Sequence, residues 1–103
     1  LVQGHVDDVG EVMELERSAD GGAWLTVRAP REVGRYLVEK GSLAVDGISL
    51  TVYGIAGGAF SVALIPYTLQ VTNLRDAKPG SVVNLEADVI AKYVERLLVA
   101  RGH

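Results

Sequence analysis

The chain has 103 residues, of which 49% are hydrophobic and 22% charged, and its formal net charge is −3. A single domain of this length should bury roughly two-thirds of the surface that the unfolded chain exposes. The absence of cysteine excludes disulfides, thiol nucleophiles and cysteine-based zinc sites. The acidic balance argues against a nucleic-acid partner, and no segment approaches the roughly 18 to 20 apolar residues of a membrane span. We expect a cytoplasmic protein without a metal or membrane site, and the start at Leu1 without methionine suggests a piece of a longer chain.

Glycine and proline divide the chain into short apolar runs. The 12 glycines and 3 prolines separate segments rich in valine, leucine, isoleucine and threonine, which is typical of a meander or a Greek key of short strands. Asp46-Gly47 has two interpretations, because it is both a hairpin signal and a possible bulge within one long strand. We expect strands over residues 10–17, 23–29, 42–46, 48–54, 59–65 and 81–87, and residues 1–6 could add an initial strand.

Two segments break the strand pattern and predict helices. Residues 30–38 read as a short helix with Pro30 in its first turn. Residues 88–100 carry apolar side chains at helical spacing, which predicts an amphipathic C-terminal helix with Asp88 as its N-cap. About six strands and two helical segments predict a mainly β fold, a small closed or nearly closed barrel with a helix packed on it.

Three polar segments stand where a plain barrel does not require them. In the first, residues 4–8, His5 could be a base or a ligand contact, or a surface histidine near a chain end. In the second, residues 40–52, Ser49 and Thr51 share one strand face and could bond the edge of a heterocycle, although both are ordinary strand residues. In the third, residues 64–72, Pro66 could free backbone carbonyls for a ligand or simply turn the chain before a helical turn capped by Thr68.

Taken in order, these segments resemble the riboflavin synthase family, whose enzymes contain two homologous barrels. The family's N-terminal barrel typically has asparagine and cysteine where this chain has Asp46 and Ser49, so the match is to the C-terminal barrel. The resemblance covers nearly the whole chain, and it rests on Gly4-His5-Val6-Asp7, Lys40-Gly41-Ser42, residues 45–52, Leu64-Ile65-Pro66-Tyr67-Thr68-Leu69 with Thr72, Val83-Asn84-Leu85-Glu86 with Asp88, and residues 92–97.

The resemblance implies a closed six-stranded Greek-key barrel that binds 6,7-dimethyl-8-ribityllumazine. In the family, two lumazines meet between the C-terminal barrel of one subunit and the N-terminal barrel of a neighbouring subunit of a homotrimer. A four-carbon unit passes between them, giving riboflavin and a pyrimidinedione without cofactor or metal. The chain by itself is then expected to bind ligand as a dimer or monomer and to turn over poorly.

The family's contact positions carry over to this chain residue by residue. His5 and Ser49 are expected near the reacting ring as the catalytic groups, and Asp88 as a substrate contact or a helix cap. Tyr67 departs from the histidine or glutamate common at its position. The expected substrate contacts are Gly4, His5, Val6, Lys40, Asp46, Ser49, Leu50, Thr51, Ala63, Leu64, Ile65, Pro66, Tyr67, Thr68 and Asp88.

Two other functions remain open at this point. A non-catalytic lumazine-binding or flavin-binding protein of the same fold would hold the ligand without converting it. A generic barrel acting as an interaction module would bind no flavin, and it would show a large exposed apolar patch in place of a polar-rimmed pocket.

Overall fold

The computed structural model describes residues 8–87 of the chain. Within this range each expected strand is present, with ends that differ by at most two residues from those read off the sequence. The elements in chain order are β1 (Asp8–Arg17), β2 (Ala23–Arg28), α1 (Arg31–Gly34), β3 (Ser42–Val45), β4 (Ile48–Ala56), β5 (Ala59–Leu64), α2 (Pro66–Val71), the 3-10 helix η1 (Asn73–Asp76) and β6 (Val82–Ala87).

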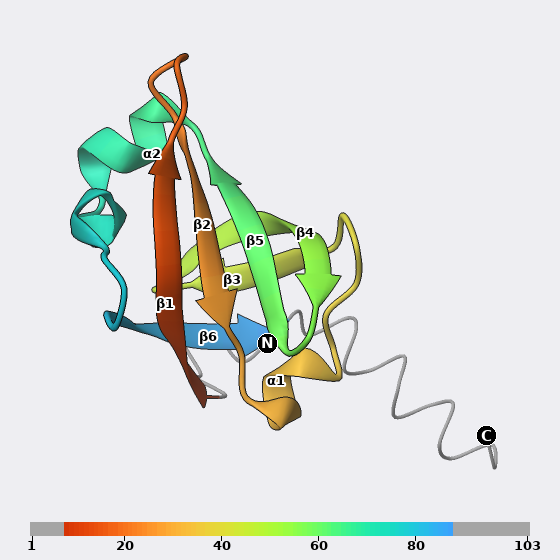
Figure 1. The fold of residues 1–103 in the computed structure, drawn as a ribbon. Helices are drawn as coiled ribbons and strands as arrows, with labels where there is room; N and C mark the ends of the chain where they lie inside the picture. Colours follow the sequence, from red (N-terminus) through yellow and green to blue (C-terminus); the bar gives the residue numbers. More distant parts are fainter. Residues whose placement is uncertain (1–7, 88–103) are drawn as a thin grey trace, which may run out of the picture.

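The strands close into an antiparallel barrel in the order β1-β2-β5-β4-β3-β6. Consecutive strands β3, β4 and β5 lie side by side, whereas β2 pairs with β5, and β6 pairs with both β3 and β1. Figure 1 shows β1, β2 and β5 forming one wall, which crosses β3 and β6 at a steep angle. The predicted closed six-stranded barrel is therefore confirmed, and its closure leaves no open sheet edge.

The Asp46-Gly47 segment is a two-residue hairpin turn. Val45 pairs with Ile48 across it, and both turn residues have positive φ, 50° for Asp46 and 83° for Gly47. This combination is the one that a type I′ turn requires and that glycine adopts without strain. The hairpin interpretation is confirmed, and a bulge within one long strand is wrong.

The barrel interior is filled by side chains. Alternate residues along each strand point inward, and the described core includes Leu25, Val27, Phe60 and Leu85, which are all 0% exposed. A core packed this way has no room for a ligand inside the barrel. A binding site must therefore lie on the outer face of the sheet or at an end of the barrel.

The helical predictions need correction. Helix α1 ends at Gly34, because the chain continues in turn bonds from Tyr36 N to Val33 O and from Leu37 N to Gly34 O. Pro30 is its N-cap, with φ −68° and ψ 160°, and it does not lie in the first turn. The possible strand over residues 1–6 and the helix over residues 88–100 lie outside the described residues.

Residues 66–71 form a short α-helix, α2, with Pro66 at its first position. A proline favours this position because its missing N–H has no partner there and its φ is already helical. Of the two interpretations that the sequence left open at Pro66, the one in which the chain turns into a helical turn is therefore confirmed. A ligand contact to the carbonyls near Pro66 stays a prediction.

Candidate functional site

Ser49 and Thr51 lie on the outer face of the barrel. Both are exposed, while Val52 in the same strand is buried. Across the pairing with β3, Ser49 is opposite Ala44 and Thr51 is opposite Ser42. The expectation that the two hydroxyls share one face is confirmed, and that face points away from the core.

The end of β5 borders this face. Val52 pairs with Val62 and Tyr53 with Ser61, and the same register continued by one residue sets Ala63 opposite Thr51. Ala63 is exposed, but Leu64 is 2% exposed and belongs to the core. Of the expected contacts at this strand end, Ala63 therefore offers its side chain and Leu64 offers only its backbone.

The first turn of α2 continues the border. Ile65 precedes the helix and is 61% exposed, and Tyr67 is 67% exposed. Thr68 is half-buried. Apolar side chains this exposed next to polar ones suit contact with a partly apolar molecule.

Four of the polar side chains expected in the site share one property. Among the described residues they have no hydrogen-bond partner and no ion-pair partner, whereas Thr26 Oγ1 and Ser61 Oγ on β2 and β5 are paired at 3.0 Å. Unpaired donors and acceptors are the groups that a ligand can engage without breaking an internal bond. They are the hydroxyls of Ser49, Thr51 and Thr68 and the ammonium group of Lys40.

Lys40 is held in a left-handed backbone conformation at the approach to β3. Its φ is 66°, a region that non-glycine residues rarely adopt. Its N–H donates to Val52 O at 2.6 Å, and Val52 N donates to Gly41 O at 2.8 Å. These two bonds fix the backbone of Lys40 beside β4 and leave its exposed side chain free among the described residues.

Asp46 lies at the other end of β3. Its carboxylate accepts a 2.7 Å hydrogen bond from Asn84 N, and its own N–H donates to Asn84 O at 2.8 Å. Lys40 and Asp46 are therefore separated by the whole of β3 and do not form one charged cluster. The Asp46 carboxylate ties the hairpin turn to β6, a structural role that the sequence did not indicate.

A cavity of about 350 Å³ opens beside the same turn. It lies between the β3–β4 turn and the α2–η1 segment. Among the described residues, its lining consists of Asp46, Ile48, Val71, Thr72, Asn73 and Leu74.

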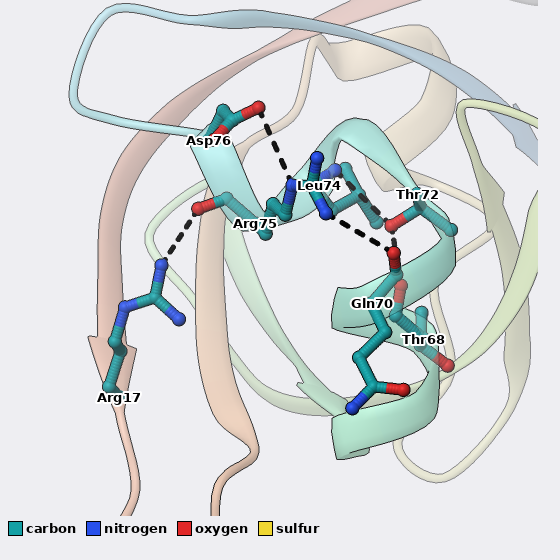
Figure 2. A network of polar contacts seen from close by, with 7 residues as sticks. All are labelled: Arg17, Thr68, Gln70, Thr72, Leu74, Arg75 and Asp76. Atoms are coloured by element: carbon teal, nitrogen blue, oxygen red, sulfur yellow. Dashed lines mark hydrogen bonds and ion pairs between the residues drawn. The ribbon is translucent and has the colours of Figure 1, made fainter.

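A network of polar contacts holds α2 and η1 against the end of β1 (Figure 2). Thr72 Oγ1 donates to Thr68 O at 2.7 Å and accepts from Leu74 N at 3.2 Å. Arg17 Nη2 donates to Arg75 O at 2.9 Å. The capping residue is therefore Thr72, and Thr68 contributes only its carbonyl. A threonine directly before Asn73-Leu74-Arg75-Asp76 was the sequence signal for this cap.

Replacing Thr72 by valine is expected to lower the free energy of unfolding by about 1 kcal/mol, because the cap of η1 and the bond to α2 are both lost. Urea denaturation measures this change. Thr51→Val is the matched control: its hydroxyl is exposed and has no partner among the described residues, so stability should stay within about 0.5 kcal/mol. Equal losses in both variants would contradict the capping role.

Four expected contacts lie outside the described residues: Gly4, His5, Val6 and Asp88. The catalytic assignment of His5 therefore stays a prediction. In the described part of the chain, no group of three or more His, Cys, Asp or Glu side chains could hold a metal ion. Over residues 8–87, none of the helices is long and apolar enough to cross a membrane.

The chain is therefore a small closed β-barrel domain with a filled interior and unpaired polar side chains on its outside. The family model described as "Lumazine binding domain" matches residues 3–88. The chain belongs to this lumazine-binding domain family.

Curated relatives share the sequence across nearly its whole length. The riboflavin synthase of Mycobacterium tuberculosis (strain ATCC 25618 / H37Rv) is 50% identical over 107 residues, covering 99% of this chain and 52% of that protein. The riboflavin synthase of Actinobacillus pleuropneumoniae is 42% identical over 101 residues, covering 98% of this chain and 46% of that protein. The chain thus spans about half the length of the curated relatives it matches.

Solved structures agree on the fold. LumP complexed with 6,7-dimethyl-8-(1'-D-ribityl) lumazine superposes with a TM-score of 0.78 at 18% identity, covering 84% of this chain and 49% of that chain. LumP complexed with riboflavin gives a TM-score of 0.79 at 18% identity, covering 85% of this chain and 47% of that chain. At this identity the likeness concerns the barrel alone.

Proposed function

We propose that this chain is the C-terminal lumazine-binding barrel of a riboflavin synthase, with residues 1–103 forming one barrel of a duplicated two-barrel enzyme. The observation that carries the proposal is the identity of up to 50% with curated riboflavin synthases over nearly the whole chain. The unpaired hydroxyls on the outer face supply groups that suit a ribityl-substituted pteridine.

In the proposed reaction, two molecules of 6,7-dimethyl-8-ribityllumazine exchange a four-carbon unit and give riboflavin and a pyrimidinedione. The methyl group at position 7 of the lumazine is acidic, because its anion delocalises into the ring. A modest base and well-placed donors therefore suffice to form that anion. We assign proton transfer to His5 and hydrogen bonding near the reacting ring to Ser49.

The binding roles follow from the place of each side chain. The Thr51 and Thr68 hydroxyls would bond the ring edge and the ribityl chain, and the Lys40 ammonium would reach the ribityl chain or the partner barrel. The Asp46 carboxylate already accepts a hydrogen bond from Asn84 N. Asp46 would therefore contact the ribityl chain or the partner barrel only through the cavity beside its turn.

The position of the face supports the need for a partner. A ligand on the outside of a filled barrel is covered from one side only, and a second surface is required to exclude water and to present the second lumazine. We assign this surface to the N-terminal barrel of a neighbouring subunit. The proposed assembly is a homotrimer of the two-barrel protein, and the proposed location is the cytoplasm.

Calorimetric titration of the 103-residue chain tests the binding half of the proposal. We expect riboflavin or the lumazine to bind at about one molecule per chain. Ser49→Ala and Thr51→Val should each weaken binding about 5- to 10-fold, since each removes one hydrogen bond of roughly 1 kcal/mol. The control is Thr26→Val, whose hydroxyl is engaged by Ser61. If the chain binds neither compound, the assignment as a lumazine-binding barrel is wrong.

Turnover is tested in the two-barrel parent protein. Incubation with the lumazine should produce riboflavin absorbance, and His5→Ala and Ser49→Ala should slow lumazine consumption. Consumption that is unchanged in both variants would show that the reacting ring lies elsewhere. A parent that binds the lumazine and forms no riboflavin would be a binding protein only.

A further inference from the structure

Glu86 lies on the same outer face as Ser49 but on a different strand. Its neighbours in β6, Leu85 and Ala87, are 0% and 4% exposed and point into the core, so Glu86 points outward. Across the pairing, Ala44 is opposite both Glu86 and Ser49. The three residues therefore form one row across β6, β3 and β4.

The row leaves a gap between two polar side chains. Neighbouring strands lie roughly 4.8 Å apart, so the Glu86 and Ser49 backbones are separated by roughly 10 Å. The residue between them, Ala44, contributes only a methyl group. A flat ring resting on that methyl group would have a carboxylate on one side and a hydroxyl on the other.

One oxygen of the Glu86 carboxylate, Oε2, is buried without a hydrogen-bond donor in the described part of the chain. Two carboxylates outside the strands do accept backbone N–H groups, Glu39 from Gly54 N at 2.6 Å and Asp46 from Asn84 N at 2.7 Å. An acceptor withdrawn from water and left without a donor costs stability. A donor from outside the chain would remove that cost.

We propose that Glu86 is a ligand-binding residue of this face, and that its Oε2 accepts a hydrogen bond from an N–H or O–H group of a planar heterocycle held over Ala44 beside Ser49. The inference rests on the proposed function, because it takes the bound molecule to be a flavin or a lumazine. Two groups of such a ligand could be the donor: the imide N–H of the ring or a hydroxyl of the ribityl chain.

Glu86→Leu separates binding from folding. Leucine keeps much of the side-chain volume and removes the unsatisfied acceptor, so the variant should melt at the same or a higher temperature than the wild type. Its affinity for riboflavin should nevertheless fall about tenfold or more, because a hydrogen bond to a charged group is lost. Glu86→Gln retains an acceptor and should lose less. A residue with a purely structural role would not combine an unchanged or higher melting temperature with a lower affinity for riboflavin.

The titrations follow flavin fluorescence with riboflavin and with lumiflavin, which has the ring and its imide but a methyl group in place of the ribityl chain. A loss for riboflavin alone assigns the contact to a ribityl hydroxyl, and a loss for both assigns it to the imide N–H. Ala44→Leu should weaken both by filling the gap. Glu14→Leu, an exposed position on β1, is the matched control and should bind like the wild type.

The outcomes separate the two proposals. If the wild type binds riboflavin and Glu86→Leu binds it equally well, the Glu86 contact is overturned and the proposed function stands. If the wild type binds neither flavin nor the lumazine, the proposed function fails and the Glu86 contact fails with it.

Discussion

Replacing Phe60 by alanine is expected to lower the free energy of unfolding by about 3–5 kcal/mol. Phe60 is the second residue of β5, is 0% exposed, and points into the barrel next to Val27 of β2, its partner in the register. It is the chain's single phenylalanine. Removing its ring leaves a cavity that the closed backbone cannot collapse to fill, since every strand is bonded on both sides.

Urea denaturation measures this change as a lower urea concentration at the unfolding midpoint, with the m-value unchanged. Small domains have a total stability of roughly 5–15 kcal/mol, so the variant should be partly unfolded well below the wild-type midpoint. Val82→Ala is the control, because Val82 is 66% exposed on β6, and its cost should stay within about 0.5 kcal/mol. A loss below about 1 kcal/mol for Phe60→Ala would mean that the ring does not fill the barrel.

Replacing Gly10 by valine is expected to cost about 2–3 kcal/mol by overpacking. A Cβ atom at this position would lie 2.7 Å from both Leu85 Cδ1 and Val27 Cγ1 and 3.0 Å from Arg28 O. Leu85 and Val27 are 0% exposed core residues of the two strands that flank β1. Both side chains are packed in the core, so the added side chain must shift one of them or β1 itself.

Gly34→Ala is the matched control for this steric effect. A Cβ there meets nothing within 4 Å, and alanine restricts the unfolded chain more than glycine does, so the variant should be unchanged or up to about 1 kcal/mol more stable. Thermal denaturation of both variants against the wild type decides the matter. A Gly10→Val protein as stable as the wild type would contradict the close approach of β1 to its neighbours.

The strands were predictable because their signals are local. Alternating apolar residues mark each run. Asp46-Gly47 is a hairpin signal, but the sequence left a bulge open there, and the positive φ of both residues decided for the turn. The shared outward face of Ser49 and Thr51 follows from the same period of two along a strand. Each of these properties depends on residues a few positions apart.

The helical segments were less predictable, because their ends do not depend on nearby residues alone. Residues 30–38 contain enough apolar side chains for a longer helix, but α1 ends at Gly34, where turn bonds replace the helical ones. At Pro66 the sequence left two interpretations open, free backbone carbonyls or a turn into a helical segment. The cap of η1 is provided by Thr72. Short helices depend on tertiary packing for most of their stability.

The sequence by itself determined the six strands and the family to which the chain belongs, and the structure decided for a turn over a bulge at Asp46-Gly47. Only the tertiary structure decided which side chains meet: Glu86 and Ser49 are 37 positions apart in the sequence and share one row through Ala44. It also decided that the Asp46 carboxylate is engaged by Asn84 N while the Thr51 and Thr68 hydroxyls have no partner among the described residues. The physical reason is that the two-residue turn sets the β3–β4 register locally, whereas β3 and β6 are far apart in the sequence and come together only when the barrel closes.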